Sequence, residues 1–174
     1  MALLDQAAIL ACAAYVDLNP IRAGIAETPE TSDFTSAQDR IVARQARHLQ
    51  PPAIAPTQTD QRRLMARADW LCPLRDTPDR RGFLAMDLDE YLVLLDWTGR
   101  KVIDGKKGAI TQHLAPILAR LHVEGDHWLH SCRHFGSMFY RVAGEARKMK
   151  AQALAAGQKW VKGMRASKAA FLAS

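Results

Sequence analysis

Cysteine and aromatic residues are scarce in this 174-residue sequence, and long hydrophobic runs are absent. The three cysteines, Cys12, Cys72 and Cys132, are odd in number and lie far apart in apolar surroundings, so we predict buried thiols rather than a disulfide framework. The apolar stretches are interrupted well before the roughly 20 residues that a transmembrane helix needs. The first residues also lack the basic segment of a secretory signal. We therefore expect a cytoplasmic protein without a membrane partner.

The charged residues are unevenly distributed along the chain. The net charge is +6, but residues 1–99 carry 10 Lys and Arg against 14 Asp and Glu, whereas residues 100–174 carry 14 against 4. The net charge is therefore −4 over residues 1–99 and +10 over residues 100–174. A basic segment of this kind is typical of proteins that bind a polyanion such as DNA, and it is also consistent with a solvated helical surface.

Apolar residues recur at helical spacing, and capping residues precede most of these segments, so we predict an all-α fold. Ser36 with Asp39 three residues later has the pattern of a capping box. Three prolines within residues 51–56 exclude a helix interior or a central strand there. We divide the chain into residues 1–49, a linker at 50–60 and a basic helical region at 61–174. The expected helices cover residues 5–18, 36–49, 60–71, 87–97, 111–121, 126–143 and 145–162.

The most distinctive stretch is residues 15–24, Tyr-Val-Asp-Leu-Asn-Pro-Ile-Arg-Ala-Gly. Pro20 removes a backbone donor and disfavours helix at the preceding residue, so the first helix should end near Leu18 or Asn19. If the helix reaches that point intact, Tyr15 and Asn19 lie four residues apart on one face and point into the same small volume. Taken alone, a tyrosine near a helix end is more often a packing residue with a hydrogen-bonded hydroxyl.

Residues 15–24 resemble the C-terminal helix of REP-associated tyrosine transposases, the single-tyrosine branch of the His-hydrophobic-His nucleases. The family pattern is close to Tyr-(Ile/Val)-x-(Leu/Ile)-Asn-Pro-(Ile/Val)-(Arg/Lys)-Ala-Gly, and this sequence fills every specified position. The resemblance is strong over residues 3–40 and less specific at Tyr91–Arg100. It implies descent from a protein that nicks and rejoins single-stranded DNA at hairpin-flanked sites.

The resemblance also implies roles for single residues. Tyr15 matches the nucleophile that attacks a DNA phosphodiester and becomes linked to the 5′ phosphate, and Asn19 matches a residue that helps to hold a divalent metal. Mg²⁺ or Mn²⁺ would activate the phosphate, because a phenol is a weak nucleophile at neutral pH. The family's His-x-His pair has no counterpart among the six histidines. We therefore interpret the chain as the C-terminal part of such a transposase, inactive alone and without a bound metal.

Basic residues are the expected DNA contacts, whether with single-stranded or hairpin-bearing DNA. Trp160 lies among the last of them, and we expect it to anchor the core rather than to stack on bases. His127, His130 and His134 share a face of a predicted helix, but zinc usually needs a ligand from a second element, so solvent or DNA is the expected neighbour. The basic loop at residues 99–108 does not match a nucleotide-binding P-loop. The expected DNA contacts are Arg22, Arg100, Lys101, Lys106, Lys107, Arg141, Arg147, Lys148, Lys150, Lys159 and Lys162.

Two functions stay open at this point. The first is a transposase-derived DNA-binding protein, and the alternative is a helical protein-interaction module without nucleic-acid binding. An isolated helix at residues 3–18 would expose a large apolar face. It must therefore pack on the appended helices or on a second copy of the chain, which leaves a homodimer open.

Overall fold

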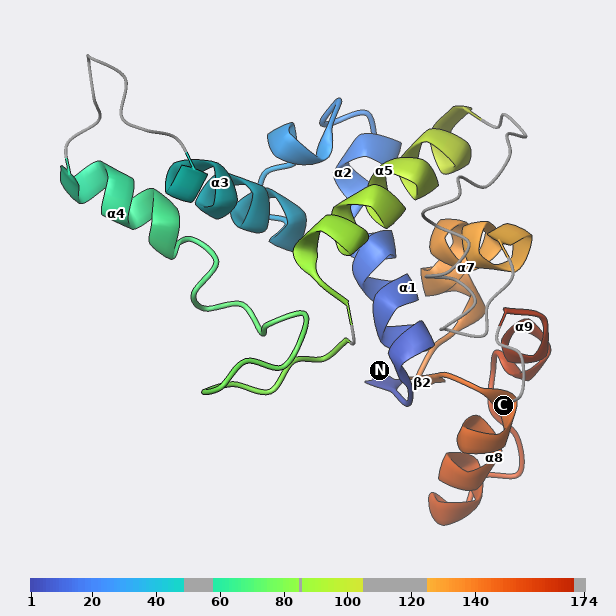
Figure 1. Ribbon diagram of the computed structural model, residues 1–174. Coiled ribbons are helices and arrows are strands. Elements are labelled where there is room, and N and C mark those ends of the chain that lie inside the picture. The colour runs from blue at the N-terminus through green and yellow to red at the C-terminus, as the bar shows by residue number, and fades with distance from the viewer. Residues whose placement is uncertain (49–57, 85, 105–124, 171–174) are drawn as a thin grey trace. The chain divides into compact units, whose positions relative to one another are not determined.

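The computed structural model describes residues 1–48, 58–84, 86–104 and 125–170, and these residues form two compact units (Figure 1). Unit 1 combines Met1–Tyr15 with Asp89–Ser174, and unit 2 is Val16–Leu88. The regular secondary structure of the described residues is helical apart from one pair of two-residue strands, so the predicted all-α class is confirmed. In this part of the chain, no helix has both the length and the apolar character needed to cross a bilayer.

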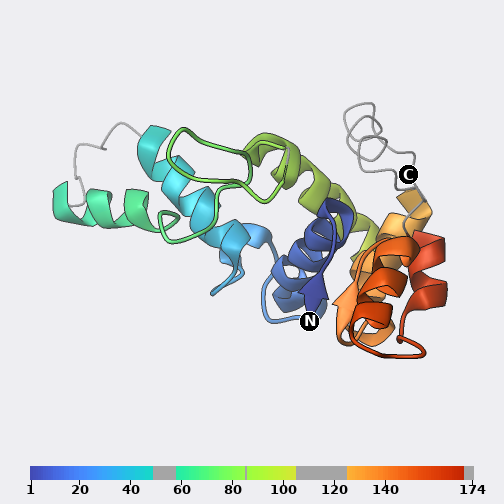
Figure 2. The ribbon, with the colours of Figure 1, turned by 90° about the horizontal axis from the view of Figure 1, so that it is seen from below.

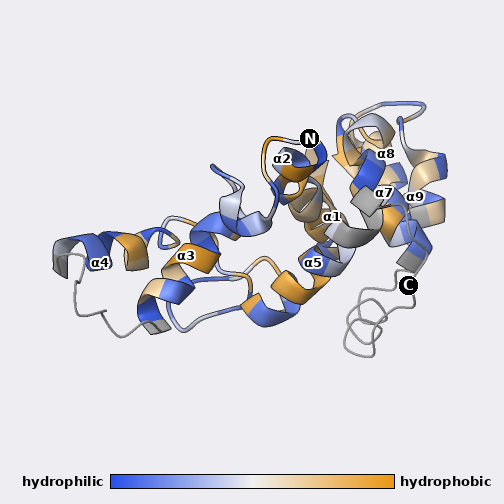
Figure 3. Cartoon of the chain, turned by 90° about the horizontal axis from the view of Figure 1, so that it is seen from above, coloured by the Kyte–Doolittle hydropathy of each residue, from blue (hydrophilic) through white to orange (hydrophobic). Residues whose placement is uncertain are grey.

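Unit 2 is built on two helices, α3 (Ser36–His48) and α4 (Gln58–Ala66), which lie side by side in Figure 1. α3 alternates between hydrophobic and hydrophilic residues, as Figure 3 shows, and its apolar face is buried. Arg47 donates to the carbonyl of Met65 at 3.3 Å and so joins the two helices. The compact units therefore do not follow the predicted boundary at residues 50–60, because the helices before and after it contact each other. Residues 50–57 of the predicted linker lie outside the described residues.

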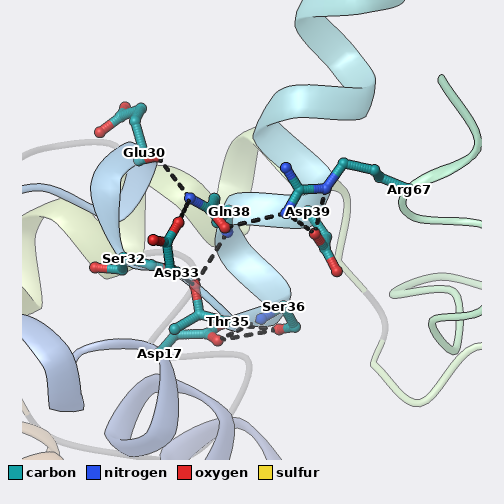
Figure 4. Close-up of polar contacts among 9 residues, drawn as sticks. All are labelled: Asp17, Glu30, Ser32, Asp33, Thr35, Ser36, Gln38, Asp39 and Arg67. Carbon is teal, nitrogen blue, oxygen red and sulfur yellow. Dashed lines mark hydrogen bonds and ion pairs between the residues drawn. The ribbon is translucent and has the colours of Figure 1, made fainter. Parts of the chain in front are cut away.

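The start of α3 is fixed by a polar network, shown in Figure 4. The Thr35 hydroxyl accepts the backbone N–H of Gln38 at 3.2 Å, so Thr35 is the N-cap, one residue before the predicted Ser36. Ser36 instead donates from its backbone N–H and its hydroxyl to the Asp17 carboxylate, at 3.0 and 2.9 Å. Asp39, the predicted partner in the capping box, instead forms an ion pair between its carboxylate and the Arg67 guanidinium at 2.7 Å. The helix was predicted correctly, but its cap was not.

Before α3, unit 2 contains two short helical turns. α2 (Asn19–Arg22) begins at the proline step of the motif, and a 3₁₀ turn, η1, covers Pro29–Thr31. Pro20 stands in the first turn of α2, where its missing N–H costs no intrahelical hydrogen bond. Asp17 and Leu18 of the motif are both buried, so these two positions have structural roles in unit 2.

Unit 1 begins with β1 (Ala2–Leu3) and α1 (Gln6–Asp17). The Asp5 carboxylate caps α1 by accepting the backbone N–H of Ala8 at 2.9 Å, and it also accepts the N–H of Glu145 at 2.6 Å. β1 pairs in parallel with β2 (Val142–Ala143), which is too short to be read from a sequence pattern (Figure 2). One carboxylate and one strand pair thus join two segments that lie about 140 residues apart in the sequence.

Two longer helices complete the core of unit 1, α5 (Leu88–Asp104) and α7 (Gly125–Met138). The Thr98 hydroxyl donates to the carbonyl of Leu94 at 2.6 Å and accepts the indole N–H of Trp128 at 2.8 Å, and all three side chains are buried. α5 was predicted to end near Trp97. It continues through Gly99 to Asp104, since a glycine within a helix costs only about 1 kcal/mol relative to alanine.

The C-terminal part of unit 1 contains α8 (Ala146–Ala155) and α9 (Met164–Ala170), which contact each other (Figure 2). The single helix predicted over residues 145–162 is therefore wrong. The helix predicted over 126–143 also ends early, at Met138, and Val142 belongs to β2 instead. The predicted helix at 111–121 lies outside the described residues.

The cysteines differ in their surroundings. Cys132 is buried and Cys12 is half-buried, and burial raises the pKa of the Cys12 thiol. Cys72 is exposed, so the prediction of a buried thiol is wrong there. It lies in an irregular part of unit 2, where its thiol approaches the carbonyl of Arg81 at 3.5 Å.

Candidate nucleic-acid interface

Tyr15 lies on the last full turn of α1 and is half-buried. Its ring packs against Phe135 of α7, with centroids 6.2 Å apart and planes tilted by 38°. A Cβ atom added to Gly136 would stand 2.9 Å from the Tyr15 hydroxyl oxygen, so the hydroxyl lies close against the backbone of α7. The side chain predicted to be a nucleophile thus has a packing position in unit 1.

Asn19, the predicted metal ligand, is exposed at the start of α2. Its side-chain oxygen accepts a hydrogen bond from the Arg22 guanidinium at 3.2 Å. α1 ends at Asp17, so Tyr15 and Asn19 belong to different helices rather than to one continuous helical face. The first helix therefore does not reach Asn19, which was the condition for the two side chains to share one volume. Arg22 has an acceptor within its own turn, the side-chain oxygen of Asn19.

A cleft of about 570 Å³ lies in unit 1, at the end of α7 and along the connection from α8 to α9. It contains three of the predicted DNA contacts, Arg141, Lys159 and Lys162, and all three are exposed. Among the described residues that line it, no side chain is acidic. The lining is completed by Tyr140, Gln158, Trp160 and Val161.

The shape of the cleft follows from two glycines that bracket residues 158–162. Gly157 has φ +66° and ends α8, with its N–H bonded to the carbonyl of Leu154 and the next N–H bonded to that of Ala153, which is a Schellman motif. Gly163 has φ +101°, and an added Cβ would stand 2.7 Å from the Phe139 ring. The connection is therefore fixed at both ends, and its second end lies beside the residue that precedes Tyr140.

Both aromatic residues of the cleft are directed to solvent. Trp160 is 78% exposed and Tyr140 is 68% exposed. The Arg141 guanidinium lies 6.0 Å from the centroid of the Tyr140 ring, at the outer limit of a cation–π contact. The expectation that Trp160 anchors the core is therefore wrong, because its segment is a connection between helices rather than a helix with a buried face.

The remaining predicted DNA contacts whose side chains the structure describes do not line this cleft. Arg147 and Lys150 are exposed on α8, whereas Lys148 is paired with Glu145 at 2.5 Å. Arg100 and Lys101 lie on α5, not in a loop, and their side chains are outside the described residues, as are Lys106 and Lys107 entirely. Among the seven predicted cations whose side chains the structure describes, three thus come together in the cleft.

The histidine stripe contains one close pair. The rings of His130 and His134 have centroids 4.8 Å apart on α7. In residues 1–48, 58–84, 86–104 and 125–170, no three His, Cys, Asp or Glu side chains come together as a metal site would require.

Four lining residues of the cleft were not predicted as contacts, namely Tyr140, Gln158, Trp160 and Val161. A signal for them was present, because Gly157 and Gly163 bracket a short segment that contains two lysines and a tryptophan. As residues that end helices, these glycines predict a connection between two helices whose side chains face water.

Comparison with protein-family models, with curated proteins and with solved structures gave no match to this chain.

Proposed function

We propose that this chain is a DNA-binding protein derived from a single-tyrosine transposase, and that the cleft of unit 1 is its DNA-binding surface. The observation that carries the proposal is the convergence of Arg141, Lys159 and Lys162 on one cleft without an acidic side chain in its described lining. Phosphate oxygens are the natural partners of such a surface, because arginine and lysine donors position nucleic acids through their backbones. The transposase origin is supported by the motif at residues 15–24.

Strand cleavage belongs, in this proposal, to a full-length parent and not to this chain alone. The Tyr15 hydroxyl lies against α7, and the Asn19 oxygen accepts a hydrogen bond from Arg22. A phosphotyrosine mechanism needs a metal and the histidines that hold it, and this sequence has no His-x-His pair. The contribution of this chain would therefore be binding.

A binding assay with a matched control tests the proposal. We expect the chain to bind fluorescein-labelled DNA at low salt, and the triple variant Arg141→Gln, Lys159→Gln, Lys162→Gln to lose affinity roughly tenfold or more. The control is Arg147→Gln, Lys150→Gln, Lys168→Gln, which removes the same charge from exposed positions of unit 1 outside the cleft. Absence of DNA binding at low salt would contradict the proposal, and equal losses in both triple variants would contradict the placement in the cleft.

A second candidate is a helical protein-interaction module, supported by a loop of unit 2. Phe34 is fully exposed and has φ +63°, a conformation that costs a residue with a side chain roughly 1–2 kcal/mol. Ile25, earlier in the same connection between helices, is 82% exposed. Backbone strain such as that at Phe34 clusters at binding sites and ligand clamps. This candidate would gain support if DNA binding were absent.

A further inference from the structure

We infer that the cleft of unit 1 binds an acidic loop from a second copy of this chain, with Phe34 of that copy inserted beside the aromatic rings of the cleft. The acidic loop is residues 23–35, which connect α2 to α3 in unit 2. The inference goes beyond the proposed function and does not depend on DNA, because both surfaces belong to the protein itself.

The first argument is the exposure and the conformation of Phe34. Its side chain is fully exposed, and its φ of +63° lies in the left-handed region that residues with a side chain rarely adopt. The backbone on both sides is nevertheless ordered, because Thr28 and Thr31 cap η1 reciprocally and Thr35 caps α3. A large ring held in water by an ordered loop fits a side chain that a partner covers.

The second argument is charge complementarity. The acidic loop has a net charge of −3, with no Lys or Arg. Its acidic residues, Glu27, Glu30 and Asp33, are exposed, and Glu27 and Glu30 take part in no ion pair among the described residues. The cleft has three exposed cations and no acidic side chain in its described lining. Opposite charges on the two surfaces favour their encounter and fix how they meet.

The third argument is the fit of a phenylalanine side chain to the cleft. The cavity of about 570 Å³ has the size of a small-ligand pocket, and its lining includes Tyr140, Trp160 and Val161. Both rings of the lining are mostly exposed, so they are available to a third ring. Aromatic side chains attract one another beyond the area that they bury, and protein interfaces typically place such anchors inside a rim of charges.

The fourth argument identifies the partner as a second copy. The homodimer that the sequence leaves open would cover the apolar face of α1, but Leu10, Ala11 and Ala14 on that face are buried within a single chain. That reason for a dimer is therefore removed. The acidic loop and the cleft are instead exposed, and every copy carries both, so each molecule supplies the aromatic anchor and the carboxylates that the cleft of another copy fits.

Sedimentation velocity of the full chain at low salt, without DNA, tests whether copies associate through Phe34. We expect association that increases with protein concentration and weakens with salt. Phe34→Gly should weaken it by about 10- to 150-fold, the range for losing one buried ring. Glycine adopts a positive φ without strain, so this variant should unfold in urea no more easily than the wild type. Trp70→Ser is the control, because Trp70 is an exposed aromatic residue of unit 2 outside the loop, and it should leave association unchanged.

Charge reversal identifies the two surfaces that meet. The loop variant Glu27→Lys, Glu30→Lys and the cleft variant Lys159→Glu, Lys162→Glu should each lose self-association, because like charges then face each other. An equimolar mixture of the two variants should associate again, since the loop of each is opposite in charge to the cleft of the other.

Three results would each overturn the inference. They are a wild-type chain that stays monomeric up to about 0.1 mM, a Phe34→Gly variant that associates as strongly as the wild type, and a mixture of the charge-reversed variants that does not associate. Because these measurements contain no DNA, a lack of DNA binding would leave the inference standing. A lack of self-association would likewise leave the proposed function standing.

Discussion

The Tyr15 hydroxyl lies so close to Gly136 that the two residues should be energetically coupled. An alanine within a helix is normally more stable than a glycine by about 0.5–1 kcal/mol. In the wild-type background we expect Gly136→Ala to lose that gain, because its Cβ would stand 2.9 Å from the hydroxyl oxygen. In the Tyr15→Phe background the oxygen is gone, so the same change should stabilise the chain by roughly the full propensity gain.

A double-mutant cycle measured by urea unfolding gives the coupling energy, which we expect to be at least about 0.5 kcal/mol. Tyr15→Phe alone supplies the reference for the loss of the hydroxyl. Additive effects would contradict the packing of Tyr15 on α7. A measured coupling would support Tyr15 as a packing residue of unit 1, whatever its role in a longer parent.

Single residues also show where the sequence was insufficient. Trp160 between two lysines fits a helix with a buried tryptophan as well as it fits an exposed connection, since both patterns place cations next to a ring. What decides between them is the backbone at Gly157 and Gly163, whose positive φ values end one helix and precede the next. The glycines were visible in the sequence, but their conformation depends on contacts such as the one with Phe139.

At the scale of an element, α3 depends on a carboxylate from outside the helix. Asp17 is 1% exposed and accepts hydrogen bonds from the backbone N–H and the hydroxyl of Ser36, two donors at the helix N-terminus. Asp17→Ala should destabilise unit 2 by about 1–3 kcal/mol, because two part-buried donors of Ser36 lose their acceptor. Asp17→Asn keeps one acceptor oxygen and should cost less.

Urea unfolding followed by circular dichroism measures both variants. Asp69→Ala is the control, since Asp69 is exposed and lies 3.6 Å from Arg47 in a surface ion pair, which is worth at most about 1 kcal/mol. If Asp17→Ala cost no more than the control, the cap would not stabilise α3. The burial of Asp17 within the motif would then need another explanation.

Helices were easier to predict than their ends. α3 and α7 were found because apolar spacing and a cap at the start are local signals. The shift of the cap from Ser36 to Thr35 was not local, because it depends on Asp17, nineteen residues earlier. The end of α5 was missed because Gly99 was interpreted as part of a loop, although a glycine within a helix costs only about 1 kcal/mol. A two-residue strand such as β2 has no periodicity to detect.

At the scale of the whole molecule, the units are defined by contacts between distant segments. The prolines at 51–56 marked a boundary by composition, yet α3 and α4 on either side of that stretch belong to unit 2. Unit 1 is joined by Asp5 and by the pairing of β1 with β2, which connect the start of the chain to residues near 145. No local pattern could have predicted that residues 1–15 and 89–174 form one unit.

The uneven charge of the chain allows a quantitative test of how DNA is bound. Each phosphate neutralised on a single strand contributes about −0.7 to the slope of log K against log salt. If only Arg141, Lys159 and Lys162 contact the strand, the slope for oligo-dT should be about −2. If residues 100–174 acted through their whole net charge of +10, it would approach about −7. Anisotropy titrations between low and physiological salt distinguish these cases.

The triple variant of the cleft further distinguishes binding in the cleft from binding through the whole basic surface. Arg141→Gln, Lys159→Gln, Lys162→Gln should flatten the slope towards zero, whereas the control triple outside the cleft should leave it near about −2. A steep slope that both triple variants reduce equally would mean that DNA is held by the general basic surface.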